Sequence, residues 1–307
     1  MKKTFEKLMF RLMQENEKII LLTADNDFID YEAFIKAYPN RCYDYGIAEC
    51  NMIGSAAGFA KEGFIPVVYG VGAFLAYRAY EFIRCDICLH NLKVICVGFG
   101  AGMKINNFGP THHSTEDISV LRSLPNLSLL SPASDNEVQP ILEKSIEHAG
   151  PTYIRLGKAY ETEIFDRIPE FEIGKSIIYR NGKDLTFFTT GNIISEVIIA
   201  SDMLKEQGID AEIINISSLK PIDNDTILKS SKKTGRIITV EEHQIEGGLG
   251  GIIAEVLTGN GSFIFDRIGL FNTFVTDYGR HKDLLELYGL DANNIFKRTI
   301  NLLSLHN

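Results

Sequence analysis

Short apolar runs alternate with longer segments of helical periodicity along the first half of the chain, and this alternation restricts the fold more than any other feature. The runs are rich in Val, Ile and Leu and are bounded by turn residues, as buried strands are: "EKIILLTAD", "FIPVVYGVG", "LKVICVGFG", "LSLLSP" and "TYIRLG". Helical spacing is found between them, in residues 4–16, 50–62, 74–90 and 135–148. We expect a doubly wound α/β domain whose sheet is mostly parallel.

The same alternation begins again in the second half. Its strand-like runs are "LTFFTTG", "AEIINIS", "RIITVEE" and "SFIFDRIGL", and its helical segments are residues 193–206, 223–233 and 250–258. A polar stretch with an Asn-Gly turn separates the halves. A chain of 307 residues, 45% of them hydrophobic, can bury two cores. We predict two doubly wound domains, residues 1–160 and 185–307, joined by a linker at 161–184.

Composition excludes several classes of function. The net charge is −9 and no dense basic run occurs, so nucleic acid is not an expected partner. No stretch of about 18 apolar residues is present, and the charged start is unlike a signal peptide, so we expect no membrane association and a cytoplasmic location. The five cysteines are an odd number and include a C-x-x-C at Cys85 and Cys88, but no second pair completes a zinc site. Reduced thiols with a structural role are favoured.

Three groups of residues could carry chemistry. Glu49 precedes a segment of small and apolar residues, where it would either stabilise a helix N-terminus or serve proton transfer as a desolvated carboxylate. Phe74, Tyr77 and Tyr80 recur at helical spacing and would form either core or a platform for a flat heteroaromatic ring. His112 and His113 lie in a loop rich in Gly, Asn and Pro, where they could act as general acid-base groups. A helix is expected after this loop, and "STED" provides a capping-type start for it.

A further motif is the Gly-rich sequence "EEHQIEGGLG", which lies at a helix entry in the second half. Such an entry can hold an anion at the helix N-terminus. A tight turn with a subunit contact is the favoured alternative.

Taken in order, five motifs resemble the second half of transketolase: "GIAECNMIGSAAGFAKEG", "VVYGVGAFLAYRAYEFIR", "GPTHHSTEDISVLRSLPN", "GPTYIRLGK" and "KTGRIITVEEHQIEGGLGGIIAEVL". The resemblance extends from about residue 4 to residue 290. It implies a pyrimidine-binding domain followed by a transketolase C-terminal domain. The cofactor that it implies is thiamine diphosphate, with magnesium.

The resemblance also implies roles for single residues. Glu49 matches the glutamate that holds N1′ of the aminopyrimidine ring, and the residues that match its aromatic neighbours are Phe74, Tyr77 and Tyr80. Asp25 matches an aspartate near the cofactor. His112 matches the loop histidine that faces the donor, so Glu49 and His112 are the expected catalytic residues. The expected substrate-contacting residues are Phe108, His112, His113 and Lys158.

The magnesium and diphosphate site of full-length transketolases is missing from this sequence, because no G-D-G motif occurs in it. No metal ligand is therefore expected in this chain. The resemblance implies the C-terminal subunit of a split transketolase, active only with an N-terminal subunit that supplies the magnesium ligands. We expect an α2β2 heterotetramer in which this chain also contacts a second copy of itself, through residues 50–62 and 74–90.

The substrate residues depart from the family pattern. Phe108 stands where transketolase has an aspartate that reads the donor's hydroxyl group, and Glu6 stands where an arginine holds the terminal phosphate. Lys158 is the remaining cation, and Arg155 could assist only if it points to the same face. We therefore expect a donor or an acceptor other than an ordinary pentose or hexose phosphate. Two alternatives stay open: a pyruvate-decarboxylating carboligase resembling deoxyxylulose phosphate synthase, and a non-catalytic scaffold.

Overall fold

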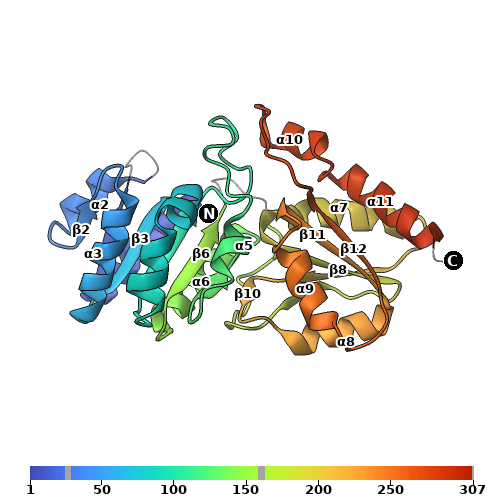
Figure 1. Ribbon diagram of the computed structural model, residues 1–307, viewed down its shortest axis with the longest axis horizontal. Coiled ribbons are helices and arrows are strands. Elements are labelled where there is room, and N and C mark those ends of the chain that lie inside the picture. Colours follow the sequence, from blue (N-terminus) through green and yellow to red (C-terminus); the bar gives the residue numbers. More distant parts are fainter. Residues whose placement is uncertain (25–28, 158–162, 306–307) are drawn as a thin grey trace.

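The computed structural model describes residues 1–24, 29–157 and 163–305. Two sheets lie side by side, each covered by helices on both faces (Figure 1). The first half of the chain forms most of the first sheet and the second half forms the second, so the predicted fold class is confirmed.

The first sheet has seven strands in the order β10-β5-β6-β4-β3-β1-β2. Its strands are β1 (Ile19–Thr23), β2 (Cys42–Asp44), β3 (Ile65–Val71), β4 (Ile95–Phe99), β5 (Ser128–Leu130), β6 (Thr152–Leu156) and β10 (Ser218–Lys220). All neighbours are parallel except β10, which comes from the second half of the chain and pairs antiparallel with β5. The second half therefore completes the first sheet.

Successive residues of these strands point to opposite faces, as the pleat requires. Ile19 and Leu21 pack with α1 (Lys2–Glu15), α2 (Tyr31–Ala37) and α6 (Asp135–Glu147), whereas Ile20 and Leu22 pack with α3 (Glu49–Lys61). The second face is also covered by the helical segment 74–88 and by α5 (Asp117–Leu121).

The second sheet has five strands in the order β12-β11-β8-β9-β7. Its strands are β7 (Ile177–Arg180), β8 (Leu185–Thr190), β9 (Ala211–Asn215), β11 (Arg236–Gln244) and β12 (Ile264–Leu270). Neighbours are parallel except β7, which pairs antiparallel with β9. The short 3-10 turn η4 (Gly191–Ile193) follows β8. The helices are α7 (Ile194–Glu206), α8 (Asn224–Thr234), α9 (Leu249–Leu257), α10 (His281–Leu287) and α11 (Ala292–Leu305).

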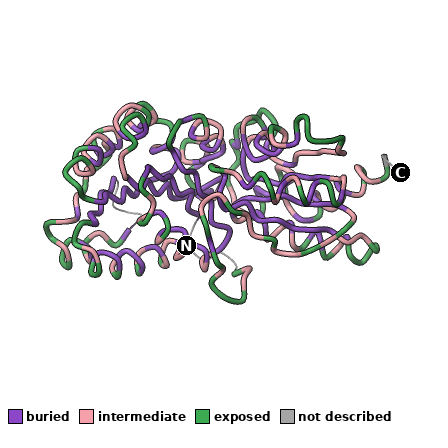
Figure 2. The backbone as a smooth tube through the Cα atoms, turned by 90° about the horizontal axis from the view of Figure 1, so that it is seen from below, coloured by how far each residue is buried: buried purple, intermediate pink, exposed green. Residues whose placement is uncertain are grey.

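The hydrophobic core continues from one sheet to the other. One cluster of buried side chains includes Met52 of α3 and Tyr153 of β6 together with Phe188 of β8 and Leu249 of α9. Figure 2 shows the strands of both sheets as buried backbone, while the surrounding helices alternate between buried and exposed turns. The two halves are thus one packed body, which fixes the position of side chains at their boundary.

The largest local difference from the sequence prediction lies in residues 74–90. The segment is helical, but it consists of π-helix η2 (Phe74–Arg78), a turn of α4 (Tyr80–Phe82) and π-helix η3 (Ile83–Cys88). The sequence also predicts neither α2 nor α10 nor α11, and β7 lies within the range predicted as linker. The proposed boundaries at 160 and 185 stay predictions.

Two findings concern the surface and the thiols. None of the helices in the described ranges is long and apolar enough to cross a lipid bilayer. All five cysteines are free thiols, and burial raises the pKa of Cys88 to about 11. Cys88 is therefore a protonated thiol at neutral pH, which suits a packing role.

Candidate functional site

The carboxyl edge of the first sheet brings together three of the predicted site residues. Glu49 begins α3 after β2, Phe74 begins η2 after β3, and His112 lies in the loop after β4. Because parallel strands end at the same edge, the segments that follow them converge there. Glu49 and Phe74 share a contact with Arg78, and Phe74 contacts His112.

Glu49 is a buried carboxylate, with 1% of its side chain exposed. Its Oε2 accepts a hydrogen bond of 2.7 Å from Nη1 of Arg78, whose guanidinium lies 4.6 Å from the centre of the Phe74 ring. The charge of Glu49 is thus matched by a cation that stacks on an aromatic face. Glu49 also occupies the first turn of α3, so the helix-start interpretation and the site interpretation describe the same position.

His112 lies between two phenylalanine rings. Its ring centre is 4.9 Å from that of Phe74, in an edge-on arrangement, and 4.8 Å from that of Phe108. Its Nδ1 is 2.9 Å from Oγ1 of Thr111. Phe108 is 54% exposed and lies beside the histidine as an apolar side chain.

The aromatic stripe is divided between different partners. Phe74 contacts His112, whereas the Tyr77 hydroxyl donates to Glu116 Oε2 over 2.9 Å and accepts from the Glu116 backbone N–H. The Tyr80 hydroxyl lies 3.2 Å from Oγ of Ser123. Of these three aromatic residues, Phe74 is the one whose ring lies against the Arg78 guanidinium, which is hydrogen-bonded to Glu49. Tyr77 and Tyr80 instead attach the helical segment to the chain that follows the histidine loop.

His113 is buried and lines a pocket of about 340 Å³ together with Tyr77, Glu116 and Phe274. Burial lowers its pKa, against the opposing effect of Glu242 and Glu116, so the ring is neutral at physiological pH. Neither ring nitrogen makes a side-chain hydrogen bond of good geometry among the described residues. His112 and His113 therefore face different surroundings.

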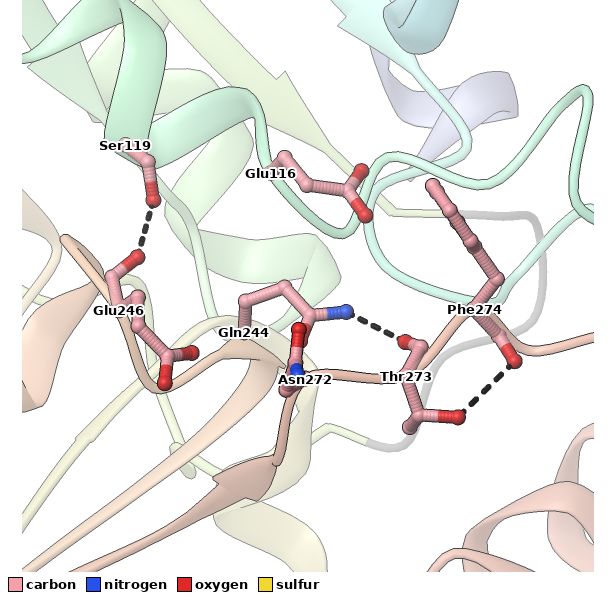
Figure 3. Close-up of a pocket in the computed structure, with 7 residues that line it drawn as sticks. All are labelled: Glu116, Ser119, Gln244, Glu246, Asn272, Thr273 and Phe274. Carbon is pink, nitrogen blue, oxygen red and sulfur yellow. Dashed lines mark hydrogen bonds between the residues drawn. The ribbon is translucent and has the colours of Figure 1, made fainter.

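A second pocket adjoins the first and shares Glu116 and Phe274 with it (Figure 3). It has a volume of about 410 Å³ and is lined by Glu116, Ser119, Gln244, Glu246, Asn272, Thr273 and Phe274. Its walls come from both halves of the chain, since Ser119 donates to the backbone carbonyl of Glu246 and Gln244 donates to that of Thr273. Glu49, Phe74 and His112 do not line it.

The loop that carries the histidines is fixed by residues of the second half. Glu242 of β11 accepts from the Met103 backbone N–H and pairs with Nε2 of His281 over 3.0 Å. Burial alone would raise the pKa of Glu242, but the charge and hydrogen bond of His281, the charge of Lys104 and the Met103 N–H together hold the pKa at about 2. The loop and the segment before α10 both rise at the top of Figure 1. Asn106 of the loop donates to the Gly279 carbonyl of that segment.

The helix after the loop does not use the predicted cap. No side-chain cap from "STED" is formed at α5; instead the Ile118 N–H donates to Nε2 of buried His243 over 3.2 Å. Burial is the main cause that lowers the pKa of His243 to about 3, so the ring stays neutral and its Nε2 can accept. The capping prediction was wrong because a residue distant in sequence takes this role.

The Gly-rich entry of α9 holds a carboxyl group that belongs to the chain itself. The carboxylate oxygens of Glu241 accept from the backbone N–H groups of Leu249 and Gly250, at 2.6 and 2.8 Å. An added Cβ at Gly248 would lie 2.0 Å from Oε2 of Glu241, so glycine is needed for this close approach. The entry is a tight turn around an internal carboxyl group.

The other candidates for binding the cofactor, the substrate or a metal add no described contact to the site. Asp25 and Lys158 lie outside the described residues. Arg155 is buried and bound to Asp117, so it does not replace Lys158 as a substrate-binding cation. Within residues 1–24, 29–157 and 163–305 no group of three or more His, Cys, Asp or Glu residues is arranged to hold a metal.

Sequence reasoning missed two residues that are central to the geometry, Arg78 and Glu116. Arg78 follows Phe74 by one helical turn, so a search for mixed aromatic and basic residues on that face would have found it. Glu116 carried no comparable signal, because its contact with Tyr77 depends on how the loop folds back onto η2.

Comparison with known proteins gives a consistent result. The family model of the transketolase pyrimidine-binding domain matches residues 1–160, and that of the transketolase C-terminal domain matches residues 174–295. A putative transketolase C-terminal section from Methanocaldococcus jannaschii is 37% identical, covering 97% of this chain and 94% of the relative. The 6-deoxy-6-sulfo-D-fructose transketolase subunit SqwH from Clostridium sp. (strain MSTE9) is 33% identical, with coverages of 96% and 91%.

A solved structure described as a split gene transketolase, inactive beta4 tetramer, matches with a TM-score of 0.87 and 34% identity, covering 99% of this chain and 98% of that chain. The 1-deoxy-D-xylulose-5-phosphate synthase 1 of Geobacter metallireducens is 37% identical over 94% of this chain, which spans only 46% of that relative's length. The two family models, together with these full-length matches, show that the chain belongs to the transketolase family, with the pyrimidine-binding and C-terminal domains of that family.

Proposed function

We propose that this chain, with a separate N-terminal subunit, transfers a two-carbon ketol unit from a ketose donor to an aldose or related acceptor. The observation that carries the proposal is the meeting of Glu49, Phe74 and His112 at one edge of the first sheet. A buried carboxylate, an aromatic face and a loop histidine together suit a cofactor ring and a carbonyl substrate.

The described residues fit the aminopyrimidine ring of thiamine diphosphate. A flat cation, the Arg78 guanidinium, already lies over Phe74 and donates to Glu49. A flat ring with a hydrogen-bonding nitrogen would make the same two contacts. Glu49 would hold the ring nitrogen, Phe74 would stack on the ring, and Tyr77 and Tyr80 would support the helical segment from which Phe74 projects.

When bound, thiamine diphosphate supplies the nucleophilic carbon that carries the two-carbon unit. Glu49 would keep a proton in place at the ring nitrogen, and its burial would keep water away from that proton. His112, held by Thr111, would donate a hydrogen bond where charge develops on the donor oxygen. Phe108 would present an apolar surface to the same donor.

The partner is proposed to supply what this sequence lacks: the diphosphate site and the magnesium ligands. Large side chains are exposed around the site, with Ile47 at 78%, Phe108 at 54% and Phe274 at 72%, which suits contact with another subunit. The split relative described as an inactive beta4 tetramer supports self-association without activity. We propose an α2β2 heterotetramer in the cytoplasm as the active form.

The donor or the acceptor is proposed to differ from ordinary pentose and hexose phosphates. Phe108 cannot accept a hydrogen bond from a sugar hydroxyl, and Glu6 is a carboxylate that accepts from the Asp30 backbone N–H. The name of one relative, 6-deoxy-6-sulfo-D-fructose transketolase subunit SqwH, refers to a sugar outside the ordinary pentose and hexose phosphates, which supports this proposal. An unphosphorylated keto sugar, a short 2-oxoacid and a nucleotide-linked sugar are the candidate classes.

The test is turnover by this chain after reconstitution with its partner. Glu49→Gln is expected to abolish transfer while the subunits still assemble, as judged by sedimentation. Glu62→Gln, at the exposed end of the same helix, is the matched control and should keep full activity. Full activity in the Glu49→Gln complex contradicts the assignment. Transfer from xylulose 5-phosphate at ordinary transketolase rates contradicts the proposed donor class, and release of carbon dioxide from pyruvate indicates the carboligase alternative.

A further inference from the structure

We propose that the Arg78 guanidinium takes the place of the cofactor ring in the free chain and has to move away before thiamine diphosphate binds. The inference rests on the proposed function of Glu49 and Phe74. It adds a residue that competes with the cofactor for both of them.

The contacts of Arg78 are those that a bound aminopyrimidine would need. Its Nη1 donates to Glu49 Oε2 over 2.7 Å, and its planar guanidinium lies 4.6 Å from the centre of the Phe74 ring. Two flat groups cannot occupy the same face of Phe74 and the same oxygen of Glu49 at once. Occupation by Arg78 and occupation by the cofactor therefore exclude each other.

Arg78 is able to leave the site. Its side chain is 47% exposed, while that of Glu49 is 1% exposed. Among the described residues, no other side chain accepts a hydrogen bond from the guanidinium. Arg78 is also the last residue of the π-helix η2, and its long side chain can rotate into solvent without a change in the buried packing of Leu75 and Ala76.

Replacement of Arg78 by the cofactor ring has a physical consequence in a split enzyme. A buried carboxylate without a partner is strongly destabilising, so Glu49 needs a cation while the subunit is alone. The same ion pair opposes cofactor binding, because it must be broken when the ring enters. Arg78 therefore stabilises the free chain and lowers its affinity for the cofactor.

The first test examines the free chain by a double-mutant cycle with Arg78→Met and Glu49→Gln. Arg78→Met should lower the urea midpoint in the wild-type background but not in the Glu49→Gln background, because the guanidinium then has no charge to neutralise. Arg84→Met, an exposed arginine of the next helical turns, is the control and should act equally in both backgrounds. Additive effects of Arg78→Met and Glu49→Gln would overturn the proposal.

The second test measures thiamine diphosphate binding to the reconstituted complex by titration calorimetry with magnesium present. The Arg78→Met complex is expected to bind about three- to tenfold more tightly than wild type, and the Arg84→Met complex as wild type does. Equal or weaker binding by Arg78→Met overturns this inference, while the function proposed above stands if Glu49→Gln and Phe74→Ala weaken binding. If the wild-type complex does not bind thiamine diphosphate at all, the proposed function and this inference both fail.

Discussion

Arg155 donates from Nε to both carboxylate oxygens of Asp117, at 3.0 and 2.8 Å, and both side chains are buried. Its Nη2 also donates to the backbone carbonyls of Ser114 and Glu242. One guanidinium thus connects β6, the start of α5, the histidine loop and β11. Because β11 belongs to the second sheet, this ion pair holds the loop of the candidate site against the other half of the chain.

Arg155→Met is expected to lower the free energy of unfolding by about 3–5 kcal/mol, because it leaves the Asp117 carboxylate buried without a cation. Urea denaturation followed by circular dichroism measures the change. The matched control is Arg298→Met in the exposed Arg298–Asp266 pair, where a loss below about 1 kcal/mol is expected. Similar losses in both variants would show that the buried pair adds no more than a surface pair.

Gly98→Ala is expected to destabilise the first sheet. An added Cβ on Gly98 of β4 would lie 2.0 Å from the hydroxyl oxygen of Tyr153, which is fully buried on β6. Overpacking of this kind costs about 1–3 kcal/mol. Tyr153→Phe removes the clashing oxygen and should restore part of the stability in the Gly98→Ala background.

The control for that series is Gly58→Ala in α3, where an added Cβ meets nothing within 4 Å. Because alanine favours the helix over glycine, we expect a gain of about 0.5–1 kcal/mol. A loss of stability at Gly58, or no loss at Gly98, in thermal or urea unfolding would contradict the close packing of Gly98 against Tyr153.

Glu241 is expected to make the stability depend on pH. Burial raises the pKa of its carboxyl from 4.5 to about 7, although the N–H groups of Gly250 and Leu249 lower it. The folded chain therefore binds this proton more tightly than the unfolded chain does. The contribution is fully present below about pH 4.5 and is lost as the pH rises through about 7.

Glu241→Gln removes this titration, so its unfolding free energy should fall less between pH 4.5 and 7 than that of wild type. The difference between the two curves is expected to change by about 1–3 kcal/mol over that range. Glu246→Gln, at an exposed position nearby, should follow the wild-type curve. Parallel curves for wild type and Glu241→Gln would contradict the raised pKa.

Phe108→Asp is expected to shift the donor preference toward hydroxylated sugar phosphates. A site that hydrogen-bonds a hydroxyl group selects strongly for it, so kcat/KM for xylulose 5-phosphate relative to the native donor should rise by about tenfold or more. Steady-state kinetics of the reconstituted enzyme measure the ratio. Phe271→Asp, at another exposed phenylalanine just after β12, is the control. An unchanged ratio would show that Phe108 does not face the donor.

The positions of most elements follow from local sequence patterns. The helical period predicts residues 50–62 and 193–206, and the structure has α3 at Glu49–Lys61 and α7 at Ile194–Glu206. Apolar runs in the same way predict most strands of both sheets. Hydrophobic periodicity is a property of neighbouring residues, so it can be found without knowledge of the remaining fold.

The partners of the polar groups could not be found in this way. The sequence indicates a carboxylate, an aromatic stripe and a histidine pair as candidates. Only the packing of α3 against η2 brings the Arg78 guanidinium into contact with the Glu49 carboxylate and the Phe74 ring. Likewise, the side chain that accepts from the Ile118 N–H is His243, from the other half of the chain.

The sequence by itself thus determined the alternation of most strands and helices, the family and the residue types of the candidate site. Only the tertiary structure decided that Arg155 serves the fold, that Glu241 fills the glycine-rich helix entry, and that residues 74–78 form a π-helix. The physical reason is that a buried charge is stable only beside its partner. That partner is chosen by which segments meet in space, and sequence spacing does not contain this information.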